Sequence, residues 1–253
     1  MEIRFAGTGS GKTSLIRFHS AFLIKQNGHT LLIDAGDGIS KALLAINENL
    51  NKIDSIILSH NHADHFAGIP SLLTQMKLNG RKSGLTISTH HLLKNFLVSF
   101  INHSYLFNET IGFDLSIQGF NFEERIDINS FIKFTAKQNR HISREKYPEG
   151  YDDIEFVSSS FLFETGGRKI VYTADIKDEK DLYLFNEDDI FITETTHVSL
   201  EEINKFIDSI NPGKLILTHI SDEDEENILN WRSGLSSKIK KKIIIAYDGL
   251  LIK

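Results

Sequence analysis

Short runs of apolar residues, separated by polar turn segments, recur along the whole chain. Runs of about four to eight residues bounded by Gly, Asn or Asp indicate β-strands, whereas longer stretches with helical spacing of apolar residues indicate helices. In the first half, strands are predicted at residues 2–5, 20–25, 30–34, 55–59 and 85–89. Helices are predicted at 38–49, 68–78 and 92–107, and mixed strands near 113–122.

The second half of the chain repeats this order of elements. Strands are predicted at 131–138, 155–165, 168–175, 189–194 and 214–219, with a closing strand at 242–253 and helices at 199–210 and 225–233. Gly166 and Gly167 form the turn of a hairpin. Each half thus begins with antiparallel strands and continues with strand–helix–strand units. This order predicts a single α/β domain over residues 1–253, in which two similar sheets pack face to face with helices outside.

Residues 6–14, AGTGSGKTS, are close to the pattern of a nucleotide-binding phosphate loop, with Ala6 in place of the first Gly. A phosphate loop needs a helix directly after it, because the helix N-terminus and the loop amides hold the phosphates. Here two apolar runs joined by Asn27-Gly28 follow, and this pair predicts a hairpin. The hairpin leaves no room for that helix, but a phosphate loop stays open here as the alternative to a strand and turn; the family resemblance described below implies the strand and turn. Lys12 is expected to be a solvated loop residue, with contact to a substrate phosphate as the alternative.

Composition is that of a soluble globular protein, with 40% apolar and 25% charged residues. The sequence shows no export signal and no run long enough to span a bilayer, so we expect a cytoplasmic protein without membrane contact. The absence of Cys excludes disulfides and Cys metal ligands. A net charge of −6 disfavours a general nucleic-acid-binding protein, and the basic segment 238–242 is interpreted as solvated surface.

The most informative segment is SIILSHNHADHFAGIP, residues 55–70. His60, His62, Asp64 and His65 follow one another closely at the end of an apolar strand. Burial of these polar groups without partners would be costly. As metal ligands, neutral imidazoles and carboxylates suit Zn²⁺, with iron or manganese as alternatives. The segment therefore predicts a metal site on a loop that rigid elements hold on both sides.

Three further residues occupy the same place relative to a predicted strand. His141 follows the strand at 131–138, Asp175 ends the one at 168–175, and His219 ends the one at 214–219. One such residue would usually be part of a loop, but three in the same layout predict further ligands. The remaining histidines, at 19, 29, 90, 91 and 103, show no ligand spacing and are predicted to be structural.

The motif HNHADH resembles the H-x-H-x-D-H signature of the metallo-β-lactamase superfamily. The segments GTGSG, LLIDAGDG, YTAD, LILTHIS and AYDG resemble its other motifs in the same order, most closely those of the ribonuclease Z branch. The resemblance covers nearly the whole chain. It implies a four-layer αββα sandwich with a dinuclear site, occupied by two Zn²⁺ ions or by Mn²⁺, between the sheets.

The resemblance also implies a role for each ligand-type residue. One metal would be held by His60, His62 and His141, the other by Asp64, His65 and His219, and Asp175 would bridge the two. His197 lies 22 residues before His219 and resembles a catalytic histidine of ribonuclease Z that binds no metal, with Glu194 as its support. Asp64, Glu194 and His197 are therefore the predicted catalytic residues. The alternative for His197 is an ordinary residue near a helix start.

Departures from the ribonuclease Z pattern bear on the substrate. Those enzymes insert a long arm that grips tRNA between the segments matching His141 and Asp175. Here these two positions are only 34 residues apart, and the segment ISREKYPEGYDD is too short for such an arm. Class B β-lactamases are disfavoured because they are exported, and glyoxalase-type thioesterases because they lack a counterpart of His197.

We predict a dinuclear zinc-dependent phosphodiesterase that hydrolyses a small nucleotide phosphodiester. The first candidate is a 3′,5′-cyclic mononucleotide, which would give the 5′-monophosphate. The chain is similar in length and layout to anti-Pycsar enzymes of phages. A tRNA 3′-end endonuclease is the alternative, and a non-catalytic binding module a third hypothesis. The resemblance implies a homodimer, and no stable nucleic-acid partner is expected. Four aromatic residues are candidates to stack on the base: Tyr105, Phe107, Tyr147 and Tyr151. A role in core or surface packing explains the presence of each equally well.

Overall fold

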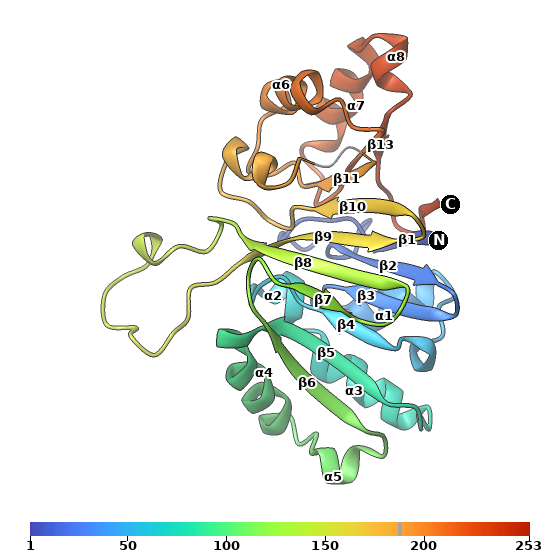
Figure 1. Ribbon diagram of the computed structural model, residues 1–253, viewed down its shortest axis with the longest axis vertical. Helices are drawn as coiled ribbons and strands as arrows, with labels where there is room; N and C mark the ends of the chain where they lie inside the picture. Colours follow the sequence, from blue (N-terminus) through green and yellow to red (C-terminus); the bar gives the residue numbers. More distant parts are fainter. Residues whose placement is uncertain (187–188) are drawn as a thin grey trace.

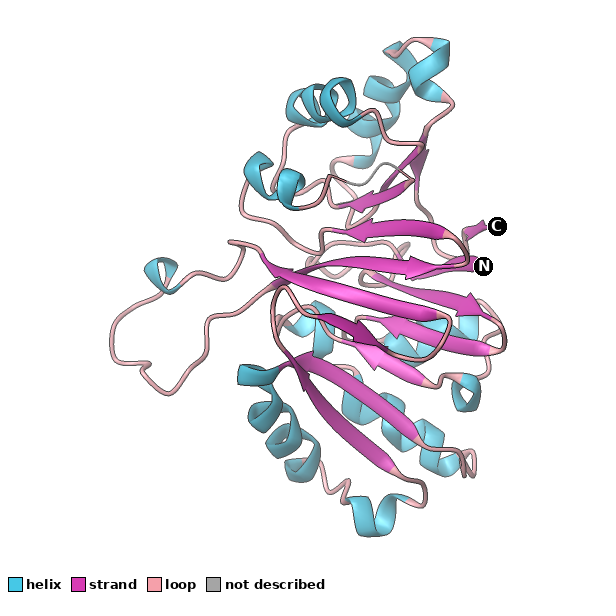
Figure 2. Ribbon diagram, in the orientation of Figure 1, coloured by secondary structure: helices cyan, strands magenta, loops and turns pink. Residues whose placement is uncertain are grey.

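The fold consists of two β-sheets that lie face to face, with helices on their outer faces (Figures 1 and 2). The computed structural model describes residues 1–186 and 189–253. Within those residues each sheet contains seven strands. The order of the layers, helix–sheet–sheet–helix, confirms the α/β sandwich predicted from the sequence. Among the described helices, none combines the length and apolar character needed to cross a bilayer.

The first sheet has the strand order β14-β1-β2-β3-β4-β5-β6. Its strands are β1 (Glu2–Gly7), β2 (Ala21–Gln26), β3 (His29–Ile33), β4 (Ser55–Ile57), β5 (Leu85–His90), β6 (Leu115–Phe120) and β14 (Leu251–Ile252). The first three strands are antiparallel neighbours, whereas β3 to β6 run parallel. Asn27 and Gly28, both with positive φ, form the turn between β2 and β3, which confirms the predicted hairpin.

Helices connect the parallel strands across the outer face of the first sheet. They are α1 (Ile39–Ala45), η1 (Leu50–Lys52), α2 (Ala63–Phe66), α3 (Ile69–Leu78), α4 (His91–His103) and α5 (Asn108–Ile111). Because side chains alternate along a strand, Leu23 of β2 packs in the core cluster under these helices, while Phe22 and Ile24 face the second sheet. Helix α4 is shorter than predicted, since Tyr105 adopts a left-handed φ of 59° that ends the helical path.

The second sheet has the strand order β13-β12-β11-β10-β9-β8-β7. Its strands are β7 (Arg125–Asp127), β8 (Ile132–Gln138), β9 (Ser159–Thr165), β10 (Arg168–Tyr172), β11 (Ile190–Thr193), β12 (Lys214–Leu217) and β13 (Ile243–Ile245). Those from β7 to β10 are antiparallel and those from β10 to β13 are parallel. Its outer face carries η3 (Glu179–Leu184), α6 (Leu200–Ile210), α7 (Glu225–Gly234) and α8 (Ser237–Lys240).

Aliphatic and aromatic side chains together fill the space between the sheets. The rings of Phe120, Phe134 and Phe161 lie edge to face with centroids 5.4 to 6.0 Å apart, and all three are buried. Burial of one such side chain stabilises the folded state by about 1.5–3 kcal/mol. This packing fixes the distance between the sheets and so positions the strand ends that carry the ligand-type residues.

Two predicted strands differ most from those observed. The closing strand at 242–253 is in fact two strands in different sheets, since β13 pairs with β12 and β14 pairs with β1. Gly249, with a φ of 91°, makes the turn between them. The strand predicted at 155–165 begins only at Ser159, because Phe156 packs against Tyr147 outside the sheet, with ring centroids 5.0 Å apart.

A long connection, residues 139–158, joins β8 to β9 and projects beyond the ends of the sheets (Figure 1). We call it the β8–β9 loop. It contains η2 (Arg144–Lys146) and the segment ISREKYPEGYDD at 142–153.

The glycine-rich segment after β1 is a turn, as predicted, and residues 8–20 contain no helix. A Cβ on Gly7 would lie 2.0 Å from the carbonyl oxygen of His19, so the close return of the chain requires glycine there. Lys12 is exposed and forms an ion pair with Glu223. Without a helix N-terminus behind the loop, the segment lacks the geometry that holds phosphates in nucleoside triphosphatases.

Candidate metal centre

The predicted ligands meet at one end of the sandwich, where strands of both sheets end. From the first sheet, the segment after β4 places His60 and His62 in a loop, and Asp64 and His65 in the first turn of α2. The second sheet contributes the residues that follow β8, β10 and β12, which are His141, Asp175 and His219. The structure therefore brings together side chains that are up to 159 positions apart in the sequence.

Glycines allow this loop to lie close to the connection after β3. A Cβ on Gly36 would lie 1.8 Å from the carbonyl oxygen of Asp64. A Cβ on Gly68 would lie 2.1 Å from the carbonyl oxygen of Gly36. Both separations are far below contact distance, so a larger residue at either position would displace α2 and the two ligand-type residues in it.

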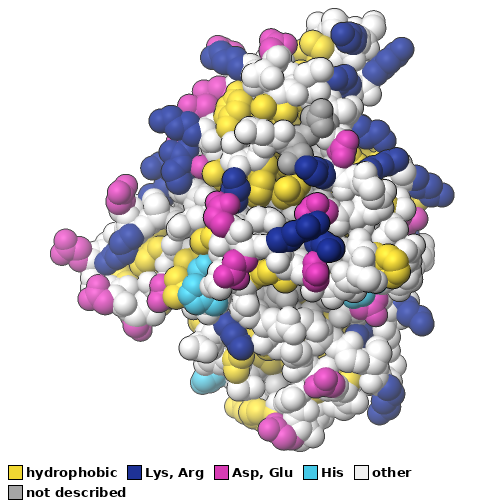
Figure 3. Space-filling model, viewed as in Figure 1, with side chains coloured by type: hydrophobic (Ala, Val, Ile, Leu, Met, Phe, Trp, Pro, Cys, Tyr) yellow, Lys and Arg dark blue, Asp and Glu magenta, His cyan; other side chains and the backbone are white. Residues whose placement is uncertain are grey.

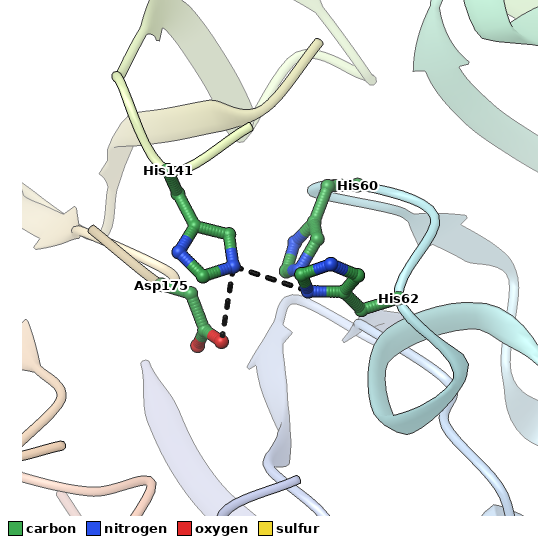
Figure 4. A group of neighbouring side chains, drawn as sticks. All are labelled: His60, His62, His141 and Asp175. Atoms are coloured by element: carbon green, nitrogen blue, oxygen red, sulfur yellow. Dashed lines mark hydrogen bonds and ion pairs between the residues drawn. The ribbon is translucent and has the colours of Figure 1, made fainter. Parts of the chain in front are cut away.

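A first group of donors consists of His60, His62, His141 and Asp175 (Figure 4). One ligand atom from each lies within 4.8 Å of those of the others. His141 Nε2 is 3.1 Å from His62 Nδ1 and 3.7 Å from Asp175 Oδ2. Figure 4 shows the imidazoles and the carboxylate pointing toward a common centre.

A second group consists of Asp64, His65, His219 and, again, Asp175. His65 Nε2 and His219 Nε2 each lie 3.3 Å from Asp64 Oδ2 and 3.3 Å from Asp175 Oδ1. Ligands at the corners of a tetrahedron, with bonds of about 2.0–2.2 Å to a central Zn²⁺, are separated by roughly 3.3–3.6 Å. The second group thus already has the spacing of a tetrahedral shell.

Buried donor atoms provide an independent test of whether ions fit here. Several side-chain N and O atoms of the described residues are buried without a hydrogen-bond partner, and three of them, His60 Nε2, His65 Nε2 and Asp175 Oδ1, come from the two donor groups. Buried polar atoms are nearly always satisfied, because leaving one unpaired costs about 1–3 kcal/mol. The residues therefore fit divalent ions, with Asp175 available to both groups.

Asp34, which the sequence reasoning did not single out, organises the second group. It is fully buried at the end of β3, and its Oδ2 lies 2.8 Å from His65 Nδ1. The same carboxylate accepts hydrogen bonds from the backbone N–H and the hydroxyl of Ser59 and from Tyr172 Oη, at 2.8 to 3.0 Å. A partner at Nδ1 fixes the ring so that Nε2 faces Asp64 and Asp175. Asp34 and Tyr172 lie within the segments LLIDAGDG and YTAD, whose resemblance to family motifs was the available signal.

The pKa values of the histidines shift in opposite directions in the two groups. Burial lowers the pKa of His60 well below its ordinary value and, against the opposing field of Asp175, lowers the pKa of His141 to about 4. Both rings are therefore neutral at physiological pH, the form that binds metals. Burial also opposes protonation of His65, but the charges of Asp175 and Asp34 outweigh it and raise the pKa of His65. The second group therefore carries the stronger negative field, which favours a cation.

His197 lies at the site but belongs to neither donor group. Its Nδ1 is 2.7 Å from Oε1 of Glu194, a buried carboxylate that also accepts hydrogen bonds from the backbone N–H groups of Ile176 and Thr196. The ring centroid of His197 is 4.9 Å from that of His141. The hydrogen bond with Glu194 raises the pKa of His197, although partial burial opposes this. The pairing of these two residues agrees with the sequence-based expectation.

The family model described as anti-Pycsar protein Apyc1 matches residues 1–243 of the chain. This chain belongs to the Apyc1 family. A curated relative in the family, anti-Pycsar protein Apyc1 of Bacillus phage BSP38, is 28% identical over 242 residues, which cover 89% of this chain and 91% of that protein. Ribonuclease Z of Bradyrhizobium sp. (strain ORS 278) is 27% identical over 285 residues, with 92% and 94% coverage.

Solved structures confirm the fold. The crystal structure of the short form of human tRNase Z superposes with a TM-score of 0.74 at 20% identity, covering 100% of this chain and 99% of that one. The metallo-β-lactamase fold protein YhfI from Bacillus subtilis gives a TM-score of 0.74 at 19% identity, with 99% and 98% coverage. These likenesses confirm the metallo-β-lactamase fold. Membership in the Apyc1 family, with the curated Apyc1 and ribonuclease Z relatives, confirms the predicted class, a metal-dependent phosphodiester hydrolase.

Metal affinity at the second donor group should depend on the hydrogen bond from Tyr172 to Asp34. Tyr172→Phe removes only the hydroxyl, so Asp34 holds His65 less firmly and metal affinity at that group falls. Loss of an outer partner of a ligand typically weakens metal binding by about 10- to 100-fold. Calorimetric titration of Zn²⁺ into metal-stripped protein measures this loss.

Tyr183→Phe is the matched control, since Tyr183 lies on η3, packed against Phe206 on the outer face of the second sheet. It should bind metal as the wild type does. Unchanged binding by Tyr172→Phe at both groups would contradict the role assigned to the Asp34–Tyr172 contact.

Proposed function

We propose that the chain is a dinuclear phosphodiesterase that hydrolyses 3′,5′-cyclic mononucleotides to 5′-monophosphates. The observation that carries this proposal is the pair of donor groups that share Asp175, with the His197–Glu194 pair beside them but outside both groups. Such a pair of groups suits phosphoryl transfer, in which negative charge on the phosphate must be balanced on both the attacking and the leaving side.

The proposed ligands follow from the geometry of the groups. His60, His62 and His141 would hold one ion, Asp64, His65 and His219 would hold the other, and Asp175 would be available to both. All are imidazoles or carboxylates, which suit Zn²⁺ best and Mn²⁺ as the second choice. When bound, the two ions supply Lewis acidity that lowers the pKa of water and neutralises charge on phosphate oxygens.

His197 is the proposed general acid. Because Glu194 raises the pKa of His197, the imidazole is held in its protonated form at higher pH than a free histidine would be. Glu194 occupies Nδ1, so Nε2 carries the proton that is available to the substrate. Water adds to phosphorus, the bond from phosphorus to O3′ breaks, and His197 protonates O3′ as it leaves; the proton that the attacking water loses returns the imidazole to its protonated form. The product is a 5′-monophosphate with a free 3′ hydroxyl.

Two features support a small substrate. The β8–β9 loop spans only residues 139–158, and the chain has a net charge of −6, which disfavours a long polyanion. The second candidate, tRNA 3′-end cleavage, is retained because the ribonuclease Z of Bradyrhizobium aligns over 92% of this chain.

Product chromatography separates these two candidates. Metal-loaded enzyme should convert a set of purine and pyrimidine 3′,5′-cyclic mononucleotides to 5′-monophosphates and leave a precursor tRNA intact. Cleavage of the precursor tRNA without hydrolysis of any cyclic mononucleotide would overturn the first candidate in favour of the second.

Removal of the proposed acid should affect chemistry and spare metal binding. His197→Ala is expected to lower kcat on a cyclic nucleotide by about 10²- to 10⁴-fold, the usual contribution of a general acid, while metal content stays that of the wild type. His219→Ala should instead lower metal content. Steady-state kinetics and elemental analysis of both variants give the comparison.

An activated ester tests the acid role further. A nitrophenyl phosphodiester has a leaving group that needs no proton, so His197→Ala should be much less impaired on it than on the cyclic nucleotide. Equal impairment on both substrates would assign His197 to charge stabilisation, and full activity on both would remove it from catalysis.

A further inference from the structure

A cavity of about 680 Å³ opens beside the metal centre, between α4 and the β8–β9 loop. Leu92, Leu93 and Phe96 form its wall on the side of α4. Tyr147 and Phe156 form part of the wall on the side of the loop. Its volume lies within the range of about 300–1,000 Å³ that is common for pockets binding small molecules.

The cavity adjoins the first donor group at one shared residue. His62 lines the cavity and also belongs to that group, and its neighbour Asn61 lines the cavity as well. A molecule that places a phosphate at the donor groups can therefore extend directly into the cavity. The surface view shows hydrophobic side chains next to a histidine where the loop joins the body (Figure 3).

Apolar side chains around the cavity stay in contact with solvent. Leu92 is 40% exposed, Phe96 48% and Tyr147 37%. The ring of Tyr147 lies against Phe156, which in turn lies under the guanidinium of Arg144 at 5.0 Å. The loop thus presents a supported aromatic surface. Exposed apolar surface gathered in a concave region next to a reactive centre is typical of a ligand-binding site.

The charges around the cavity disfavour the phosphate of a nucleotide and suit a neutral ring. Among the described residues that line it, none is Lys or Arg, whereas Asp153 and Glu155 contribute carboxylates. A phosphate would be repelled there and attracted to the donor groups. A neutral planar ring that stacks on aromatic side chains fits the walls, and Asn61 and Asn95 provide amides that donate and accept hydrogen bonds at its edge.

We propose that this cavity binds the nucleobase of the substrate, which stacks on Phe96 and Tyr147 while the cyclic phosphate lies at the donor groups. This inference rests on the proposed function and adds the residues that recognise the base. It also divides the aromatic residues singled out in the sequence. Tyr147 and Tyr151 line the cavity, whereas Tyr105 and Phe107 are not among its lining residues.

The test compares a cyclic nucleotide with ribose 3′,5′-cyclic phosphate that carries no base. Base stacking on one aromatic side chain corresponds to roughly 10- to 100-fold in affinity. Phe96→Ala and Tyr147→Ala should therefore lower the ratio of kcat/KM for the nucleotide to kcat/KM for the base-free substrate by that factor. Tyr147→Phe keeps the ring and should restore the ratio.

Phe107→Ala is the matched control for Phe96→Ala, since Phe107 is 42% exposed and follows the same helix outside the cavity. Tyr105→Ala is the matched control for Tyr147→Ala, since Tyr105 is also an exposed aromatic residue outside the cavity. Both controls should keep the wild-type ratio. Activity on the base-free substrate shows that each variant is folded. A wild-type ratio in both Phe96→Ala and Tyr147→Ala would overturn the proposal.

Failure of the proposed function would look different, because the wild type would then hydrolyse neither substrate. In that case equilibrium dialysis with radiolabelled adenosine and cytidine tests the cavity directly. Saturable binding that is lost in Phe96→Ala and kept in Phe107→Ala would support the cavity as a base site. Absence of binding to the wild type would overturn it.

Discussion

The site depends on one buried carboxylate, Asp175, which follows β10 of the second sheet and meets histidines from both sheets. Its Oδ1 lies 3.3 Å from His65 and from His219, and its Oδ2 lies 3.7 Å from His141. A buried charge needs a compensating partner. The charges of His219 and His65 hold the pKa of Asp175 well below its ordinary value, although burial opposes this. The carboxylate therefore stays ionised and joins the two donor groups.

The scaffold holds this carboxylate in register with the first sheet. The apolar core between the sheets sets their spacing, and Tyr172 of β10 reaches across to Asp34 at the end of β3. Tyr172, the donor of that hydrogen bond, lies only three residues before Asp175 in the sequence. Asp34, its acceptor, in turn orients His65. A displacement of one sheet relative to the other would therefore disturb both donor groups together. Chemistry at the site and packing of the core are coupled through these few contacts.

Local sequence predicted most of the strands and pointed to the ligand-type residues, because each of those residues lies within a few positions of the end of an apolar run. Contacts made only in the folded chain could not be predicted in this way. Asp34 and Tyr172 belong to different sheets, and nothing in the spacing between them indicates a hydrogen bond. The split of the closing strand depends on the turn at Gly249. The cavity forms only when the β8–β9 loop and α4 meet, which explains why Phe96 was not singled out while Tyr147 was considered for its ring alone.

We propose that two ions share Asp175, and the number of bound ions can be measured directly. Metal-stripped protein is titrated with Zn²⁺ in a calorimeter, and bound metal is determined by elemental analysis after dialysis. The geometry of the two donor groups predicts two ions per chain and, for Asp175→Ala, weaker binding of both. A stoichiometry of one or none in the wild type, or a loss confined to a single ion in Asp175→Ala, would contradict a shared dinuclear centre.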